Sequence, residues 1–545
     1  MNDSLVPSDE LKLRVSETLF SHIDGIAIGS TVLSLKNQEV FKTLLALEDP
    51  VDIGLLARKA GFREGFFQVA LRLLAHQGFV KLSARADLGR SEVSLTREGR
   101  EWSNFLNYYE QIPKISEMAE LLIEESNGNS SLEAVDFALP SYPAGFNHSP
   151  LARRVHDHVF GEISAVIMTE MYLRLERQKT LPMRDNFIRH EDISASRAVS
   201  GFTADVMGHS GWATQNPDGI CLTESGRLAL EWTPQYFYPV SYLATLRNVS
   251  NLLDASQTML PRPHSTCMET HVDRRLDIRF SGLVYEKTCR RQFLDIVLPL
   301  FDRNPIEEQP ASIVDTGSGD GTLLVDLFQA IRHKTIRGRF LESFPLQIVG
   351  AEFNEVARDS TQKAFTQAGL ANALTIFGDI GNPETLEHGL AQRGIDPFNA
   401  LHVNKSVIHN RSYKNPRDRA RLIAWQPTSR APFVAADGGL IESREAECNL
   451  VEFFEDWRRL TGKHGMVVIE AHTVDPEVVC RKVGRNIMTC VDATHGYSTQ
   501  YLIEYDAFLR AARTAGYESR DQRILSEAGA GRPTLAVNHF IQKTA

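Results

Sequence analysis

The chain has 545 residues. A chain of this length is too long to fold around a single hydrophobic core, so the length alone predicts two to four domains. Its composition, 42% hydrophobic and 23% charged, is that of a soluble globular protein, and its apolar runs are far shorter than the roughly 18 to 20 residues that cross a bilayer. A formal net charge of −10 argues against a nucleic-acid partner, because phosphate binding needs a basic field.

The cysteines and the first residues bear on cellular location. The six cysteines include no Cys-x-x-Cys pair, and thinly scattered thiols in a large chain indicate a reducing compartment. The start, Met1-Asn2-Asp3-Ser4, is polar and lacks the basic and then apolar pattern of a signal peptide. We therefore expect a cytoplasmic protein that does not associate with membranes.

Residues 1–120 are predicted to form a mostly helical, winged-helix-like domain. Apolar residues recur at helical spacing over residues 51–80. The segment closes with Gly78-Phe79-Val80, and a polar hairpin then leads to Leu95-Thr96-Arg97-Glu98-Gly99. A helix pair followed by a turn, a hairpin and a new helix start is typical of a winged helix.

A similar pattern recurs near residues 190–235. There Gly211-Trp212-Ala213 precedes Leu222-Thr223-Glu224-Ser225-Gly226, which indicates a weak internal repeat and a second winged-helix-like unit. Such units can bind DNA, but the acidic charge and the lack of a basic recognition helix favour a lid or a dimerisation module.

From about residue 281 the pattern changes to strands that alternate with helices, as in a parallel sheet. We therefore predict three domains: the winged-helix-like domain 1–120, a helical lid or second winged-helix-like unit 121–280, and a ligand-binding α/β core 281–545.

A glycine-rich loop opens this core. The apolar run Ser312-Ile313-Val314-Asp315 ends in an acid and is followed by Gly317-Ser318-Gly319-Asp320-Gly321 and then by a helical pattern over residues 322–331. Glycines let the backbone turn sharply against a ligand, and a helix N-terminus offers unpaired N–H groups. An acid at the strand end and another among the glycines suit a zwitterion with an ammonium group better than a pyrophosphate, although a dinucleotide fold is the alternative.

Two more acids follow buried strands. Glu352 ends the strand 346–352 and is placed to pair with both ribose hydroxyls, and Asp379, after the strand at 374–377, could accept from an adenine amino group. With the glycine loop, this order resembles the class I methyltransferase family over roughly residues 285–545.

That resemblance implies an α/β fold with a Rossmann-like class I methyltransferase core, preceded by a large, mostly α-helical region with winged-helix-like units. It also implies S-adenosylmethionine as the cofactor. The cofactor-binding residues expected on this basis are Asp315, Gly317, Ser318, Gly319, Glu352, Phe353, Asp379, Ile380 and Asn404.

The next strand, residues 400–404, leads into the segment from Lys405 to Tyr413. Ligands of α/β sheets lie beyond the carboxyl ends of the strands, so this segment should face the transferable methyl group. It resembles the K-x-x-x-H-D stretch of winged-helix O-methyltransferases, in which the histidine is the general base, but Asn410 stands where that family usually has Asp. The predicted catalytic residues are His409, Arg411 and Tyr413.

Two further histidines lie near the end of the chain. His472 follows the strand 466–470, and His495 lies in the segment 492–501, which we expect to be a loop before a helix that starts near Tyr505. Histidines on loops at one sheet edge are candidate ligands for a first-row transition metal, and the alternative is that they are ordinary polar loop residues.

The segments H-N-R-x-Y, from His409, and D-A-x-H-G-x-S-x-Q-Y, from Asp492, together with the helical region before the core, resemble the mononuclear iron- or manganese-dependent C-methyltransferases of polyketide assembly lines, of the apratoxin loading-module type. That family methylates the carbon between two carbonyls of an acyl thioester beside a bound iron or manganese ion. The resemblance implies that the metal ligands are His409, His495 and Gln500, with His472 in reserve.

The leading hypothesis is thus a metal-assisted C-methyltransferase acting on the carbon alpha to a carbonyl of a small acidic substrate. A Lewis acid would stabilise the enolate that makes such a carbon nucleophilic. The substrate is expected to be a malonyl-type thioester on a carrier protein or coenzyme A, or a keto acid, and a homodimer is one option. The alternatives are a metal-free O-methyltransferase with His409 as the base and a transcriptional regulator that senses the donor.

Overall fold

The structure, a computed structural model, describes residues 7–47, 49–85, 90–126, 139, 149–181, 186–257, 270–529 and 531–543. The chain folds as two compact units. Unit 1 comprises Met1–Met259, Thr270–Asp277 and Val479–Tyr497, and unit 2 comprises Leu260–Glu269, Ile278–Val478 and Ser498–Ala545. The segment Val479–Tyr497 therefore belongs to unit 1, although it lies within the range expected for the core. The three-domain division stays a prediction, because the two units do not test its finer boundaries.

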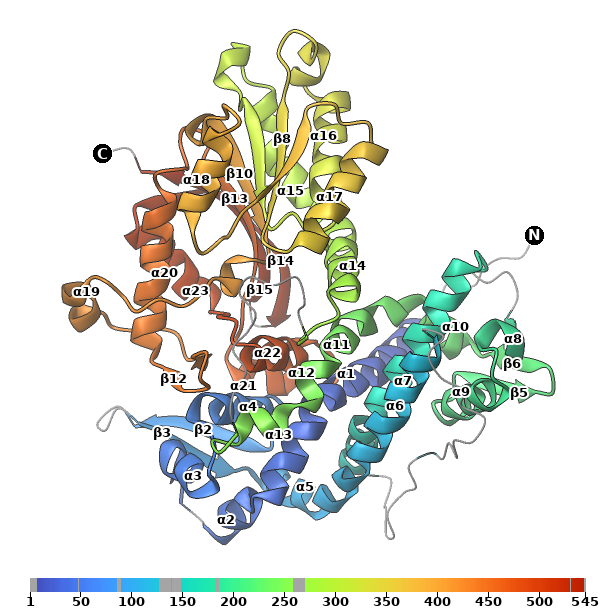
Figure 1. Cartoon of the computed structure of the whole chain (residues 1–545). Coiled ribbons are helices and arrows are strands. Elements are labelled where there is room, and N and C mark those ends of the chain that lie inside the picture. The colour runs from blue at the N-terminus through green and yellow to red at the C-terminus, as the bar shows by residue number, and fades with distance from the viewer. Residues whose placement is uncertain are drawn as a thin grey trace. The chain divides into compact units, whose positions relative to one another are not determined.

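Unit 2 is built on a seven-stranded sheet (Figure 1). Its strands in chain order are β7 (Ser312–Thr316), β8 (Gln347–Glu352), β9 (Ala373–Phe377), β10 (Ala400–Lys405), β13 (Met466–Ala471), β14 (Tyr517–Gly529) and β15 (Arg532–Gln542). The spatial order is β14-β15-β13-β10-β7-β8-β9, and the five strands from β13 to β9 are parallel. β15 runs antiparallel to both β13 and β14. The first five strands thus have the doubly wound order 3-2-1-4-5, and the predicted Rossmann-like core is confirmed.

Alternating residues of the central strands face two separate cores. Val314 and Val349 pack with helices α18 (Pro383–Ala391), α20 (Ser443–Trp457) and α23 (Tyr505–Thr514). Ile313 and Ile348 pack on the opposite face with α15 (Arg290–Val297), α16 (Thr322–Lys334) and α17 (Glu355–Gln367). Because both faces are covered, the strands carry apolar residues on both faces, which is why the sequence predicts them well.

Unit 1 contains both predicted winged-helix-like units. The first consists of β1 (Val51–Asp52), α3 (Ile53–Ala60), α4 (Glu64–His76), β2 (Val80–Arg85) and β3 (Arg90–Leu95), and the second of β4 (Phe187–Arg189), α8 (His190–Ile193), α9 (Arg197–His209), β5 (Ala213–Asn216) and β6 (Gly219–Leu222). Each has a three-stranded sheet in which the first strand pairs with the third. The repeat suggested by the sequence is therefore a repeat of structure.

The L-T-x-x-G motif has the same role in both copies. The hydroxyl of Thr96 accepts a hydrogen bond from the amide of Gly99 and starts helix α5 (Arg97–Trp102), and Thr223 does the same with Gly226 for α10 (Glu224–Trp232). A Cβ on either glycine would lie 1.8 Å from a backbone oxygen, that of Phe79 or of Trp212 respectively. Glycine is thus required where this helix passes the end of the preceding hairpin.

Two long helices precede the winged units, α1 (Asp9–Asn37) and α7 (Pro150–Arg177), and they cross at glycines. A Cβ on Gly25 would lie 2.2 Å from the carbonyl oxygen of His158, and one on Gly161 would lie 2.3 Å from that of His22. The contact is thus reciprocal, between one His-x-x-Gly turn in each helix. Of the described helices, α1 alone is long and apolar enough to span a bilayer, and 78% of its most apolar stretch is buried inside the protein.

Candidate active site

The glycine loop after β7 is held tightly between neighbouring elements of unit 2. Gly317, Gly319 and Gly321 all have positive φ, at 85°, 58° and 79°. The amide of Gly317 donates to the carbonyl of Ala351 at 2.8 Å, and a Cβ on Gly317 would lie 2.4 Å from Cγ1 of Val407. The loop therefore needs glycine at position 317 both for its backbone conformation and for space.

Asp315 lies at the carboxyl end of β7 with its side chain buried. Burial, together with the negative charges of Glu352 and Asp320, raises the pKa of Asp315 to about 8, and Lys405 opposes that shift. Within the described part of the chain, Oδ1 of Asp315 has no hydrogen-bond partner. A buried carboxyl group with an unused oxygen fits a cationic ligand such as the ammonium of the expected methyl donor.

Two more buried polar atoms lie without a partner among the described residues at this edge of the sheet. They are Oγ1 of Thr316, at the end of β7, and Oδ1 of Asn404, in the adjacent strand β10. These strands flank the point where the sheet order reverses, which is where doubly wound sheets bind ligands. Three unsatisfied oxygens at one sheet edge fit a polar ligand, because buried polar groups are otherwise paired.

Glu352 ties the glycine loop to the end of β8. Its Oε2 accepts from the amide of Gly319 at 3.1 Å, and its Oε1 accepts from that of Phe353 at 2.9 Å. Phe353 and Phe377 are exposed, and their ring centroids lie 5.5 Å apart. These rings form an apolar surface next to Glu352 that suits a planar base.

The other expected cofactor residues have more local roles. Oδ1 of Asp379 accepts from the amide of Gly381 at 2.8 Å, and Ile380 packs in the core. The hydroxyl of Ser318 is hydrogen-bonded to that of Thr361 in α17 at 3.0 Å. The side chain of Ser318 is therefore directed toward α17, and only the backbone of this residue would contact a ligand.

His409 lies in a short helical turn after β10, as predicted, and is paired with an acid that the sequence did not suggest. Its Nδ1 lies 2.6 Å from Oε1 of Glu470, at the end of β13, and both side chains are buried. The amide of Ile408 donates to Oε2 of Glu470 at 2.9 Å. Burial favours a raised pKa for Glu470, but the neighbouring His409 and the hydrogen bond from it outweigh this and lower the pKa. Glu470 thus supplies the carboxylate that Asn410 lacks.

Arg411 and Tyr413 support the His409 loop. Arg411 is buried, and it donates to the carbonyl of Ile408 at 3.1 Å and to Oδ1 of Asn449 at 3.0 Å. Burial lowers the pKa of Arg411 to about 10. The rings of Tyr413 and Tyr501 lie 6.1 Å apart, and the amide of Tyr501 donates to the carbonyl of His409 at 2.7 Å. Arg411, predicted as catalytic, therefore makes contacts that fix the loop.

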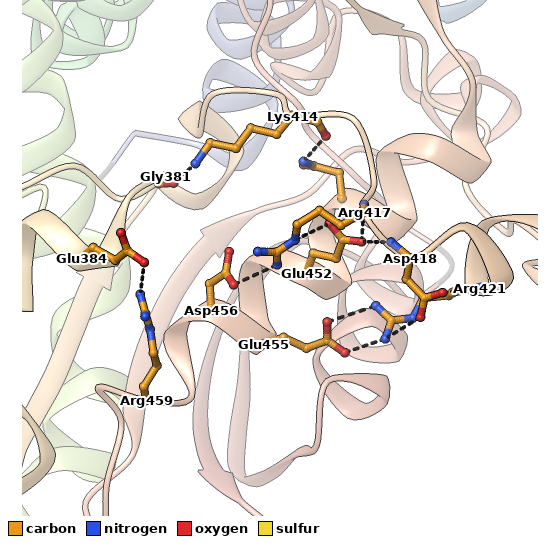
Figure 2. Close-up of polar contacts among 11 residues, drawn as sticks. Gly381, Glu384, Lys414, Arg417, Asp418, Arg421, Glu452, Glu455, Asp456 and Arg459 are labelled. Atoms are coloured by element: carbon orange, nitrogen blue, oxygen red, sulfur yellow. Dashed lines mark hydrogen bonds and ion pairs between the residues drawn. The ribbon is translucent and has the colours of Figure 1, made fainter.

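The segment beyond Tyr413 is held to α20 by ion pairs (Figure 2). Arg417 contacts Glu452 and Asp456, and Arg421 forms two hydrogen bonds with Glu455, at 2.6 and 3.1 Å. The backbone amides of Arg417 and Asp418 also donate to Glu452. The chain that leaves the histidine loop is thereby fixed on a core helix.

His472, predicted as a reserve metal ligand, is fully buried in unit 2. Its Nδ1 lies 3.3 Å from the carbonyl oxygen of Ile503, and its ring packs against those of Tyr505 and Phe508 at 5.0 and 5.1 Å. Burial lowers the pKa of His472 to about 4. These contacts are those of a neutral histidine packed in a core.

Gln500 and His495 lie in different units. Gln500 precedes α23 in unit 2, in the predicted loop, and is buried. His495 lies in helix α22 (Met488–Tyr497) of unit 1, so the prediction of a loop is wrong at this position. Thr, Gly and Asp are weak helix formers, but the helix is buried and packing overrides propensity. Nδ1 of His495 lies 2.7 Å from the carbonyl of Val491 and 3.2 Å from the hydroxyl of Tyr238.

Among the residues that the structure describes, no group of three or more His, Cys, Asp or Glu side chains forms a metal site. The predicted ligands His409, His495 and Gln500 are not such a group. One of them is a glutamine, and the three residues belong to two different units. Sequence reasoning missed Glu470 and Tyr238, the partners of the two histidines. Of these, Glu470 carried a signal, since it is an acid at the end of an apolar strand.

Two family models match the chain. The AprA MT2-like domain matches residues 269–527, and the AprA N-terminal domain matches residues 15–82. No curated protein matches the chain.

Several solved structures are similar in outline. An O-methyltransferase family protein from Burkholderia thailandensis has 12% identity, covering 68% of this chain and 93% of its own, with a TM-score of 0.38. The mitomycin 7-O-methyltransferase MmcR has 12% identity, covering 72% and 97%, with a TM-score of 0.39. The CurJ carbon methyltransferase has 11% identity, covering 69% and 91%, with a TM-score of 0.32.

Proposed function

Residues 269–527 match the AprA MT2-like methyltransferase domain and residues 15–82 match the AprA N-terminal domain, and from this premise we propose that the protein methylates the carbon alpha to a carbonyl with the help of a bound iron or manganese ion. That it is a methyltransferase dependent on S-adenosylmethionine follows from the family itself. The acceptor carbon, the metal and the substrate class are the proposal.

The observation that carries the proposal is the pair formed by His409 and Glu470. Because the carboxylate accepts from Nδ1 at 2.6 Å, the imidazole is held as the tautomer with its proton on Nδ1. Nε2 is then the basic nitrogen, as in histidines that bind metals, whose second nitrogen commonly donates to a carboxylate. His495 is held as the same tautomer. Its Nδ1 must be the donor to the Val491 carbonyl, because a carbonyl oxygen can only accept, and Nε2 is again the basic nitrogen.

In this proposal His409, His495 and Gln500 hold the metal. When bound, the ion supplies a positive charge that neutralises an enolate oxygen of the substrate. The chain's own residues orient the reactants: Glu470 fixes the ring of His409, Arg411 fixes its loop, and the glycine loop with Asp315 binds the donor. The substrate class in this proposal is a malonyl-type thioester or a keto acid, whose enolate oxygen a bound metal ion would stabilise.

The pair formed by His409 and Glu470 also supports one alternative function. A histidine whose Nδ1 donates to a carboxylate is also a good general base, since the imidazolium that forms is stabilised by the charge of Glu470. In that case the enzyme is a metal-free O-methyltransferase, and His409 takes the proton of a hydroxyl group.

Metal content and donor affinity of the purified protein distinguish the two functions. We expect one equivalent of iron or manganese in the wild type. His495→Ala should lose both the metal and the activity, while its dissociation constant for S-adenosylmethionine changes less than twofold. His388→Ala, at an exposed position on α18, is the control and should retain the metal. A metal-free wild type, together with full activity in His495→Ala, would overturn the proposal in favour of the O-methyltransferase.

The product tests the acceptor atom. With malonyl coenzyme A and the donor labelled with ¹³C in its methyl group, NMR should show the new methyl bonded to carbon. A methoxy resonance on substrates of either class would exclude carbon methylation.

Glu470→Gln tests the role of the acid. The amide preserves size but removes the charge, so we expect metal affinity or activity to fall by roughly 10- to 100-fold, as is typical for partners of ligand histidines. Glu384→Gln, in a surface ion pair with Arg459, should leave both unchanged. Unchanged metal affinity and activity in Glu470→Gln would show that the pair has no part in the reaction.

A further inference from the structure

Helix α22 lies in Val479–Tyr497, the later segment of the chain that belongs to unit 1, and it is buried there on nearly every side. All its residues except Val491 are buried. A Cβ on Gly496 would lie 2.7 Å from Cγ1 of Val69, so α22 lies almost against the side chains of α4. Because α22 is enclosed in this way, a small number of polar contacts can determine its position in unit 1.

The contact at its centre is a buried ion pair. Nε of Arg72, in α4, lies 2.5 Å from Oδ2 of Asp492, and the two side chains are only 3% and 5% exposed. Nε2 of His76 lies 3.4 Å from the same oxygen. Removing two charges from water costs about as much as their attraction returns, so such a pair adds little stability. What it can add is a preferred register, because a shift of the helix would separate two buried charges that attract each other.

Neutral hydrogen bonds hold α22 at its two ends. Near the start, Nε2 of Gln77 donates to Oγ1 of Thr489 at 3.0 Å. At the end, the hydroxyls of Tyr497 and Thr31 are 2.8 Å apart. Tyr238 contacts both Thr494 and the Nδ1 of His495. The charged contact therefore lies one helical turn before His495, on the same helix.

The internal repeat shows that Arg72 is not a residue that the winged helix itself needs. α4 and α9 have equal length, and each is followed by a glycine and an aromatic residue, Gly78-Phe79 and Gly211-Trp212. Counted back from that glycine, the position of Arg72 is occupied in the second copy by Asp205, which is exposed. The buried arginine is thus specific to the copy that binds α22.

We infer that the Arg72–Asp492 ion pair sets the register of α22 on unit 1 and thereby orients His495. Both residues are positioning residues, since they act on the reaction through the helix. The effect on His495 rests on the proposed function, in which this histidine is a metal ligand, whereas the effect on α22 is independent of it.

The thiol of Cys490 reports on the docking of α22. It is fully buried on this helix. We expect Arg72→Met and Asp492→Asn to be alkylated at Cys490 by N-ethylmaleimide at least tenfold faster than the wild type, with the site located by peptide mass spectrometry. Arg72→Lys should restore most of the protection. Asp205→Asn is the matched control and should label like the wild type. Wild-type labelling in Asp492→Asn would overturn the inference.

A double variant separates register from docking. In Arg72→Met with Asp492→Leu both charges are replaced by apolar groups, so the helix should stay docked and Cys490 protected, but the register is no longer fixed. We expect its metal content to fall at least threefold, with unchanged donor affinity. Full metal content would overturn the positioning role. A wild type without metal would instead refute the proposed function, and the labelling of Asp492→Asn would still decide whether the pair holds α22.

Discussion

Gly317 joins two parts of the candidate active site that are far apart in the sequence. Its left-handed backbone turns the chain from β7 toward α16, and its missing side chain makes room for Val407, two residues before His409. The glycine loop and the histidine loop are therefore in direct contact. A change at Gly317 should therefore alter both the glycine loop, which we propose binds the donor, and the loop that carries His409.

Gly317→Ala is expected to weaken donor binding more than tenfold and to destabilise unit 2 by roughly 2 to 4 kcal/mol, from the sum of left-handed strain and overpacking against Val407. Gly394→Ala is the control, because Gly394 has a similar φ of 67° but open space around its Cβ position. It should cost only the strain, about 1 kcal/mol. Calorimetric titration with S-adenosylmethionine and urea unfolding measure both effects, and equal losses in the two variants would contradict the role of Val407.

Much of the site was predictable because its residues follow buried strands. Asp315, Asn404 and His409 lie at the sheet edge where the sequence placed them, since the carboxyl ends of parallel strands share one edge. Glu470 could not be assigned as the partner of His409. It lies 61 residues later in the chain, and the pairing exists only because β13 lies next to β10.

At the scale of elements, the reciprocal crossing of α1 and α7 sets how closely the two halves of unit 1 can approach. Each helix presents a glycine to the backbone of the other, at Gly25 and Gly161. Next to each glycine contact, a buried histidine bonds a tyrosine of the opposite half: His22 bonds Tyr236 at 2.8 Å, and His158 bonds Tyr109 at 3.0 Å. The two copies of the repeat thus exchange equivalent contacts, as the subunits of a symmetric dimer do.

Gly161→Ala should destabilise unit 1 by about 1 to 3 kcal/mol or more, because the new methyl group meets backbone atoms that cannot move independently. Gly201→Ala, in the middle of α9, is the control, because, among the described residues, no atom beyond the helix's own backbone lies within 4 Å of the position of its Cβ. Its free energy of unfolding should be unchanged or higher by up to about 1 kcal/mol. Thermal unfolding followed by circular dichroism compares the two. If Gly161→Ala is as stable as Gly201→Ala, helices α1 and α7 can move apart at their crossing without loss of stability.

The predictability of the elements follows their packing. The parallel strands and the helices of unit 2 carry regular apolar patterns, and the sequence predicts them. Helix α22 is enclosed on nearly every side and contains Asp492, Thr494 and Gly496, so it has neither a one-sided pattern nor strong helix formers. Its structure is imposed by unit 1, which a reading of local sequence cannot detect.

At the scale of the whole molecule, both units bury histidines that resist protonation. Burial lowers the pKa of His22, in unit 1, to about 3, and of His472, in unit 2, to about 4. The unfolded chain therefore binds more protons than the folded one below the ordinary pKa of 6.5, and stability falls as the pH drops from about 6.5 toward 4. Asp24 and Asp315, whose pKa values burial raises to about 6 and about 8, act in the opposite direction and reduce the slope.

His472→Gln should flatten this dependence for unit 2. By linkage, neutral His472 costs about 2 kcal/mol at pH 5 and almost nothing at pH 7, so the variant should lose about 2 kcal/mol less than the wild type between these pH values. Urea unfolding at the two pH values, followed by a probe in each unit, measures the difference. A loss equal to that of the wild type would mean that His472 is protonated in the folded state or is not buried.

The membership of Val479–Tyr497 in unit 1 has a consequence for the synthesis of the protein. Asp492, which pairs with Arg72, lies 420 residues further along the chain. At the usual ribosomal rate of roughly 5 to 20 residues per second, this interval is about 20 to 80 seconds. During that time the face of α4 that packs against α22 lacks this helix. Unit 1, which contains the first residues of the chain, is therefore completed only after most of unit 2 has been made.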